Sequence, residues 1–321
     1  MPMLCTVGPG VVDELLRRLA AGKVFGHKVP CQIARRLGGG ATNTGRAARL
    51  TGVDVRAILL TGDDDERRAV ETMAREEFTQ PVCVPNLKQT RRSILIGDDC
   101  FTVRSPVTSQ ALPQYAAEIV GEADFTIVAP MTPGDHAFVL NVLGLARASV
   151  LMLSNEQLHD GDSACELSRH ASLTVVNDAE LQTWMGTADI EVGIRRLGLR
   201  GIKNVIVTHE RGAMAVIDGE SIAALAYTLN GRRSTIGAGD TFVGHLAAAR
   251  VVGTDWREAI DLGLRGAARH LETGSAGTPE ELTEFAAHHP RLAPRANGRS
   301  ISRRTAAAAT VAAVVIWLSL P

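Results

Sequence analysis

Ser234–Leu246 reads S-T-I-G-A-G-D-T-F-V-G-H-L and joins a run of small residues to the start of an apolar helix. Small residues let the backbone approach a ligand closely, and the first N–H groups of a helix have no intrahelical acceptor. Gly237, Ala238 and Gly239 are therefore expected to form an anion site, most naturally for a phosphate. Asp240 follows at the helix start, where a carboxylate beside a phosphate is placed to act as a base in phosphoryl transfer. A glycine turn capped by an aspartate, without any ligand, explains the same residues equally well.

A second glycine cluster lies at Leu37–Leu50, which reads L-G-G-G-A-T-N-T-G-R-A-A-R-L. Gly38 and Gly39 precede Asn43 at another expected helix start, where the amide offers a donor and an acceptor to a hydroxyl-rich ligand. With both clusters in place, the sequence resembles the ribokinase-like (PfkB) family of carbohydrate and nucleoside kinases over roughly residues 4–287. Two further glycines stand at the family's spacing, Gly52 and Gly62.

The resemblance implies an ATP-dependent kinase that phosphorylates a hydroxyl group of a sugar or sugar-like molecule. Asp240 is then the base, and the amides of Gly237–Gly239 together with Mg²⁺ stabilise the developing charge. The substrate-binding residues implied are Asp13, Gly38, Gly39 and Asn43. From the residues alone, Asp13 is equally compatible with a surface helix that leads into the amphipathic run L-L-R-R-L-A. A nucleoside kinase, or a catalytically weak relative that binds sugar or nucleotide, remains an alternative.

Asn177 and Glu180 follow an apolar strand, and their three-residue spacing places them on one face of the next helix. Ligands of open α/β folds bind at this edge of the sheet. The resemblance implies that this pair organises Mg²⁺ and its waters, since Mg²⁺ prefers oxygen ligands and keeps several waters. The same spacing is that of a helix capping box, which needs no metal.

A nucleotide-binding loop is implied at Thr208–Gly212, with Thr208, Gly212 and Gly239 as the contacts to the nucleotide. The segment reads T-H-E-R-G and is one residue shorter than the family's usual Thr-x-Gly-x-x-Gly pattern, so its first glycine is missing. This departure puts the affinity for the nucleotide, or its identity, in question.

Short apolar runs alternate with helical patterns along most of the chain, which predicts a mainly parallel, doubly wound sheet with helices on both faces. The predicted strands are Val55–Leu60, Phe125–Ala129, Val150–Leu153, Leu173–Val176 and Asn204–Thr208. Asp65–Phe78 is predicted to be a helix that buries Ala69, Met73 and Phe78.

Two segments interrupt this alternation and predict a small β lid. Arg92–Arg104 is typical of a hairpin that turns at Gly97-Asp98-Asp99, and Lys23–Arg36 is predicted to add a strand. The resemblance implies that these strands cover the sugar and that the lid offers a surface for a homodimer. An ordinary edge hairpin is the alternative.

Composition excludes several classes of protein. The net charge of −1 argues against a nucleic-acid partner. Five scattered cysteines without metal-ligand spacing indicate a reduced, cytoplasmic environment. The N-terminal residues lack the charged and apolar segments of a secretion signal.

The last residues lie outside the resemblance, which assigns residues 1–287 to the kinase domain. Residues 288–304 are rich in Arg, Pro, Gly and Ser and are expected to form a flexible basic linker. Thr305–Pro321 carries no charge, and its length of roughly 17 residues is the lower limit for crossing a bilayer. The tail is either a membrane anchor, with the arginines holding the domain on the cytoplasmic side, or a disordered or packed segment.

The anchor can be tested by fractionation. We expect the full-length chain to partition with membranes and a chain that ends at His288 to be soluble and fully active. On anionic lipid the arginines should add roughly 1 kcal/mol each, an effect that weakens in salt. Full-length protein found wholly in the soluble fraction at low salt would exclude the anchor.

Overall fold

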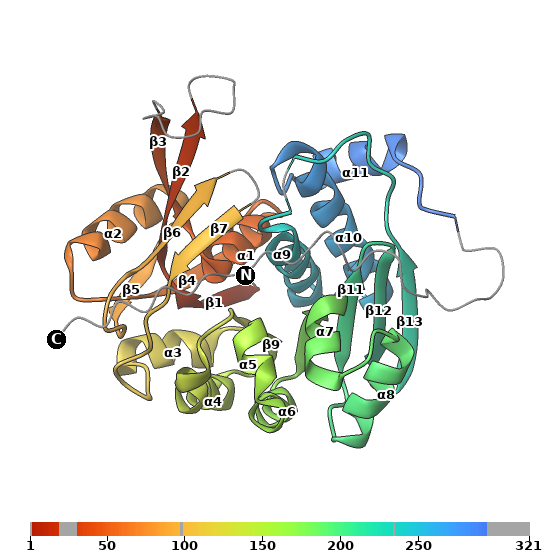
Figure 1. Ribbon diagram of the computed structural model, residues 1–321, viewed down its shortest axis with the longest axis horizontal. Coiled ribbons are helices and arrows are strands. Elements are labelled where there is room, and N and C mark those ends of the chain that lie inside the picture. Colours follow the sequence, from red (N-terminus) through yellow and green to blue (C-terminus); the bar gives the residue numbers. More distant parts are fainter. Residues whose placement is uncertain (1, 19–30, 97–98, 234, 294–321) are drawn as a thin grey trace, which may run out of the picture.

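The computed structural model describes residues 2–18, 31–96, 99–233 and 235–293. Its main sheet has nine strands in the order β13-β12-β11-β10-β9-β8-β1-β4-β5 (Figure 1). Seven of them, from β11 to β5, run parallel, and β12 and β13 are added antiparallel at one edge. The strands are β1 (Met3–Pro9), β4 (Asp54–Thr61), β5 (Val82–Pro85), β8 (Phe125–Val128), β9 (Ser149–Met152), β10 (Leu173–Asn177), β11 (Val205–His209), β12 (Gly212–Ile217) and β13 (Glu220–Leu225).

Helices cover both faces of this sheet. One core cluster joins the strands to α1, α2, α9, α10 and α11, and the other joins them to α3 to α8. The helices are α1 (Gly40–Arg49), α2 (Asp65–Glu77), α3 (Gln114–Glu122), α4 (His136–Leu145), α5 (Asn155–His159), α6 (Gly161–His170), α7 (Asp178–Met185), α8 (Ile190–Leu199), α9 (Ala238–Val251), α10 (Trp256–Thr273) and α11 (Pro279–His288). The predicted doubly wound α/β fold is therefore confirmed.

Strand side chains divide between the two clusters because successive residues point to opposite faces. In β1, Leu4 belongs to one cluster and Cys5 to the other. The predicted helix at Asp65–Phe78 forms as α2, and Phe78 is buried as predicted, but the other two buried positions were each wrong by one residue. Val70 and Ala74 are fully buried, whereas Ala69 and Met73 are only partly buried.

The predicted lid forms a second sheet with the strand order β3-β2-β6-β7, which projects from the main sheet in Figure 1. Its strands are β2 (Val11–Arg18), β3 (Cys31–Gly38), β6 (Arg91–Ile96) and β7 (Asp99–Val103). The surface helix considered around Asp13 was wrong, because β2 is a strand paired with both β3 and β6. Residues 23–30 of the predicted strand and residues 97–98 of the predicted turn lie outside the described residues.

Helices α1 and α9 pack in very close contact beneath the lid. An added Cβ at Gly244 of α9 would lie 2.4 Å from the carbonyl oxygen of Thr44 and 2.7 Å from the Cβ of Ala47. Only a glycine at position 244 allows the two backbones to approach this closely. The separation of α1 and α9 is therefore fixed by direct backbone contact.

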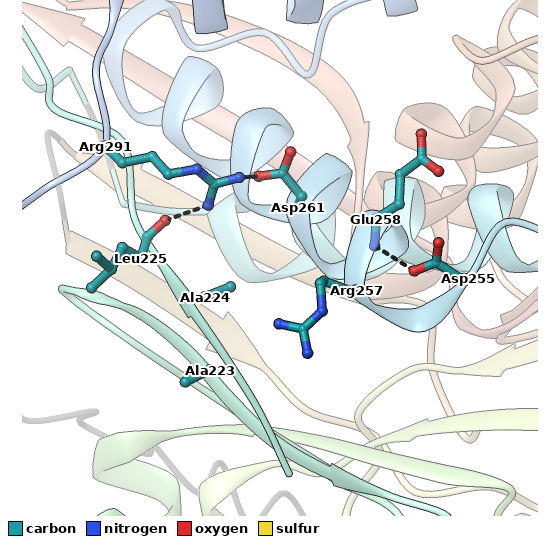
Figure 2. Close-up of a pocket in the computed structure, with 8 residues that line it drawn as sticks. All are labelled: Ala223, Ala224, Leu225, Asp255, Arg257, Glu258, Asp261 and Arg291. Carbon is teal, nitrogen blue, oxygen red and sulfur yellow. Dashed lines mark hydrogen bonds and ion pairs between the residues drawn. The ribbon is translucent and has the colours of Figure 1, made fainter. Parts of the chain in front are cut away.

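The chain beyond α11 contacts the domain as far as Ala293, whose carbonyl oxygen accepts a hydrogen bond from Arg211 at 2.8 Å. Arg291 forms an ion pair with Asp261 of α10 and donates a hydrogen bond to the carbonyl oxygen of Leu225 at 3.1 Å (Figure 2). The guanidinium also lies 5.0 Å from the ring centroid of Tyr227. A shortened chain for the fractionation test should therefore end at Ala293 rather than at His288.

Among the described helices, none combines the length and the apolar character that crossing a bilayer requires. Thr305–Pro321 and most of the predicted linker lie outside the described residues, and membrane attachment of this tail stays a prediction.

Candidate active site

Asp240 lies in the first turn of α9 and contacts α1, the helix that was predicted to begin after Gly38 and Gly39. Asn43, in α1, donates a hydrogen bond from Nδ2 to Oδ2 of Asp240 at 2.8 Å. Burial raises the pKa of Asp240, while the bond from Asn43 and the charges of His270 and Arg46 act in the opposite direction. Two motifs that are 197 residues apart in sequence thus meet at one carboxylate.

Asp13 projects from β2 of the lid toward the same site. An added Cβ at Gly38 would lie 2.2 Å from the Asp13 carboxyl group, so a side chain at position 38 would displace it. Arg36, the cross-strand partner of Asp13, holds its Nε 3.5 Å from Oδ2. Burial raises the pKa of Asp13, and the nearby charge of Asp240 raises it further against the opposing effect of Arg36 and Arg46. The two carboxylates are therefore close enough to repel one another.

The predicted anion site forms the N-terminus of α9. Gly237 is its N-cap, with φ at 89°, in the left-handed region that favours glycine. No side chain of the described residues caps this helix, and the N–H of Ala238 is directed to the carbonyl oxygen of Thr235 at 3.3 Å. The N–H groups of Gly239 and Asp240 are therefore the donors that α9 offers to an anion.

Asn177 and Glu180 form the capping box that their spacing allows. The N–H of Asn177 donates to Oε2 of Glu180, and the N–H of Glu180 donates to Oδ1 of Asn177, both at 2.8 Å. Burial raises the pKa of Glu180 to about 7, and the charges of Asp240 and Asp178 add to the increase. The residue as a whole is half-buried, so its carboxyl group lies at the surface of the site but in poor contact with water.

The shortened segment at Thr208–Gly212 is a tight hairpin. Thr208 pairs with Asn177 on the neighbouring strand β10, which places it at the same sheet edge as Glu180. Gly212 lies inside β12, where its backbone pairs with Leu225 of β13 and an added Cβ would overlap the carbonyl oxygen of Ala224. Strand pairing alone is sufficient to require a glycine at position 212.

Sequence reasoning missed three residues around the site, Arg46, Glu77 and His270. Arg46 donates from Nη1 to Oδ1 of Asn43 at 3.0 Å and forms a two-pronged ion pair with Glu77 of α2. His270 of α10 lies 2.8 Å from the carbonyl oxygen of Ile236, beside Gly237. The three-residue spacing of Asn43 and Arg46 on one helix could have indicated their contact. Glu77 and His270 come from distant segments, and no local pattern indicates their position.

The hollow shown in Figure 2 lies elsewhere, between β13 and α10. Its volume is about 480 Å³, and none of the predicted site residues lines it. Within the described residues, no group of three or more His, Cys, Asp or Glu side chains is arranged to hold a metal ion.

Solved structures share this fold over most of their length. A ribokinase from Arabidopsis thaliana complexed with ribose and ATP superposes with a TM-score of 0.68 at 17% identity, covering 88% of this chain and 98% of that chain. A nucleoside kinase from Methanocaldococcus jannaschii gives 0.69 at 15% identity, covering 90% and 99%. A provisionally assigned ribokinase II from Escherichia coli in complex with ATP and Mg²⁺ gives 0.73 at 14% identity, covering 90% and 100%.

Comparison of the sequence with protein families identifies the family of this chain. No curated protein is similar enough in sequence to match. Residues 11–282 match the pfkB family of carbohydrate kinases, and this range includes both glycine clusters, the lid and Asp240. With the ribokinase-like fold and the site geometry described above, this match shows that the chain belongs to the pfkB family of carbohydrate kinases.

Proposed function

We propose that this protein transfers the γ-phosphoryl group of ATP to a hydroxyl group of a sugar or sugar-like substrate. One observation carries the proposal: Asp240 stands at the open N-terminus of α9, bonded to Asn43 and close to Asp13 of the lid. Phosphoryl transfer needs a positioned base, an anion site and polar groups that hold the acceptor alcohol. This cluster offers a candidate for each of the three, which supports the proposal.

Each group of residues has a separate role in the proposed reaction. Asp13 and the backbone at Gly38 and Gly39 hold the substrate hydroxyls beneath the lid. Oδ2 of Asp240 is occupied by Asn43, so Oδ1 accepts the proton of the attacking hydroxyl. Within the loop Gly237–Gly239 and the helix start that follows it, the amides of Gly239 and Asp240 stabilise the charge that grows on the transferred phosphoryl group, since the N–H of Ala238 is directed to Thr235.

Mg²⁺ fits the residues at the sheet edge. Burial is the main cause that raises the pKa of Glu180, and the charges of Asp240 and Asp178 add to it, so a bound cation would favour the ionised carboxylate. Asn177 and Glu180 would hold the ion through its waters, and the ion would neutralise phosphate charge in the bound nucleotide. The nucleotide is proposed to lie along Thr208, although the short hairpin offers it less backbone than the usual loop.

A homodimer through the lid is also proposed. The cross-strand register places five exposed apolar residues on one face of the lid, opposite to the face that carries Asp13. These residues are Ile33, Ile94, Ile96, Phe101 and Val103. An exposed apolar patch of this kind marks an interaction surface, and a second copy of the chain supplies a matching one.

The first prediction concerns the base. Asp240→Asn should lower kcat at least about 100-fold while leaving the fold and ATP binding intact, because the amide cannot take up a proton. Turnover would be measured with ATP and Mg²⁺ against a panel of sugars and nucleosides, and folding by thermal denaturation. Wild-type kcat in the variant would remove Asp240 from this role. Wild-type protein that binds ATP but phosphorylates no member of the panel would favour the catalytically weak relative.

The second prediction concerns the metal and the pH. Glu180→Gln should raise the Mg²⁺ concentration needed for half-maximal activity, because a charged contributor is lost. Glutamine preserves the capping box, so the helix should remain intact. The pKa of Glu180 is above its ordinary value of 4.5, so the folded state binds the extra proton. Wild-type stability relative to the variant should therefore fall as the pH rises from about 4.5 to about 7.

Both parts of that prediction are measured separately. Titration of activity with Mg²⁺ tests the first, and melting temperatures of the two proteins without metal, from pH 4 to pH 8 in steps of about one unit, test the second. An unchanged Mg²⁺ requirement together with a lower melting temperature at every pH would mean that Glu180 only caps α7.

The third prediction concerns the lid surface. A double variant, Phe101→Ser with Val103→Ser, should shift the protein from dimer to monomer in sedimentation velocity, since about half of the exposed patch is removed. Leu199→Ser is the matched control, because Leu199 is 90% exposed at the end of α8, outside the lid. Wild-type protein that sediments as a monomer at all concentrations would contradict the proposed dimer.

A further inference from the structure

Arg46 is the centre of a chain of contacts that leads from α2 to the proposed base. Its Nε and Nη2 lie 2.9 and 2.8 Å from the two carboxylate oxygens of Glu77, which is the bidentate geometry of a strong ion pair. Nη2 also donates to the carbonyl oxygen of Leu37 at 3.0 Å, and Nη1 donates to Oδ1 of Asn43 at 3.0 Å. The guanidinium is thus hydrogen-bonded to α2, to the end of strand β3 at Leu37, and to Asn43.

These contacts decide the orientation of the Asn43 amide. Arginine can only donate hydrogen bonds, so the atom of Asn43 that faces Arg46 must be the oxygen. The amide nitrogen must then face Asp240, whose carboxylate accepts the bond at 2.8 Å. Without Arg46, the side-chain amide of Asn43 could rotate. Its bond to Oδ2 of Asp240 would then no longer be fixed, and either carboxylate oxygen of Asp240 could be the one without a partner.

The position of Glu77 indicates that the ion pair has a role beyond the stability of α2. Glu77 is the last residue of α2, where a negative charge opposes the helix dipole. Local helix chemistry therefore disfavours an acid at this position, and its bond to Arg46 is the compensating contact. A residue that breaks a local rule is expected near a functional site.

We propose that Arg46, anchored by Glu77, is a positioning residue that fixes the amide of Asn43 against Oδ2 of Asp240 and leaves Oδ1 for the substrate proton. Gly40 lies on the Oδ1 side, where an added Cβ would be 3.5 Å away, so this oxygen faces a position without a side chain. The inference rests on the proposed kinase function of Asp240. It assigns to Arg46 an effect on the reaction without contact to the substrate.

Arg46 also acts on Asp240 through its charge. The charged or titratable groups that face Asp240 are Asp13 from β2, Glu180 from α7, His270 from α10 and Arg46 from α1. Arg46 lowers the pKa of both Asp13 and Asp240, against the burial that raises them. Loss of the guanidinium should therefore raise the pKa of Asp240 in the folded protein.

The test compares Arg46→Met, Arg46→Lys and Glu77→Gln with a matched control, Arg67→Met. Arg67 forms an ion pair of similar exposure with Glu71 within α2, and neither residue contacts the site. Arg46→Met should lower kcat about 10- to 100-fold, the usual effect of a small misplacement, and should move the acidic limb of the kcat/KM profile to higher pH. Arg46→Lys should keep the acidic limb near its original pH but restore kcat only in part, because lysine lacks the forked geometry.

Glu77→Gln separates the effect of the position of Arg46 from the effect of its charge. The variant retains the charge of Arg46 but loses its anchor, so kcat should fall without any rise in the pKa of Asp240. The control variant should change only the melting temperature. If Arg46→Met lowers the melting temperature as Arg67→Met does and leaves both kcat and the pH profile unchanged, the role of Arg46 is structural and the proposal is wrong.

A second measurement does not depend on turnover. The pKa of Asp240 can be followed by NMR in protein labelled with carboxyl-¹³C aspartate, with the signal assigned from Asp240→Asn. We expect a higher pKa in Arg46→Met than in wild type, and an unchanged value would overturn the inference. A wild-type protein without kinase activity would contradict the proposed function alone, since the titration still reports the contact between Arg46, Asn43 and Asp240.

Discussion

The site depends on the burial of three carboxyl groups that the fold gathers around the N-terminus of α9. Asp240, Asp13 and Glu180 come from α9, β2 and α7, and burial raises the pKa of each, with the charge of Asp240 adding to the rise for Asp13 and Glu180. Such a cluster is stable only when cations or donors approach it. Arg36, Arg46 and His270 supply part of this compensation. Under the proposed function, Mg²⁺ bound with the nucleotide phosphates would add to this compensation.

The main sheet and the lid contribute different residues to the candidate site. The helices α1 and α9, which lie on the main sheet, carry Asn43, Arg46 and Asp240, and their direct contact sets the distance between these side chains. The lid carries Asp13 and Arg36 on one face and the exposed apolar patch on the other. If the proposed substrate site and the proposed dimer both hold, the same four strands would connect the two, and a change in one lid could reach the other copy through the strands themselves.

Much of this structure could be predicted from the sequence, and the failures have physical causes. Five of the seven parallel strands were predicted in the sequence analysis, because they are largely buried on both faces and are therefore continuously apolar. They are β4, β8, β9, β10 and β11. The strand β2 was not predicted. Its sequence, V-V-D-E-L-L-R-R, has a pattern of charged and apolar residues that fits an amphipathic helix as well as a lid strand with one face toward a polar site. The glycine motifs located Asp240, Asn43 and Gly38 because their requirements are local. Glu77 and His270 could not be located, since only the tertiary fold brings α2 and α10 to the site.

The close contact of α1 and α9 has a consequence for the way the protein unfolds. The sequence of α1, G-A-T-N-T-G-R-A-A-R, contains two glycines and two threonines and is a poor helix by itself. Its stability comes from the core and from α9, which in turn needs Gly244 at their crossing. We therefore expect the helix pair that carries Asn43 and Asp240 to unfold together with the core, unlike the loops that commonly carry active sites. Amide protons in α1 should exchange only when the whole domain opens, so the chemistry and the fold are lost in a single event.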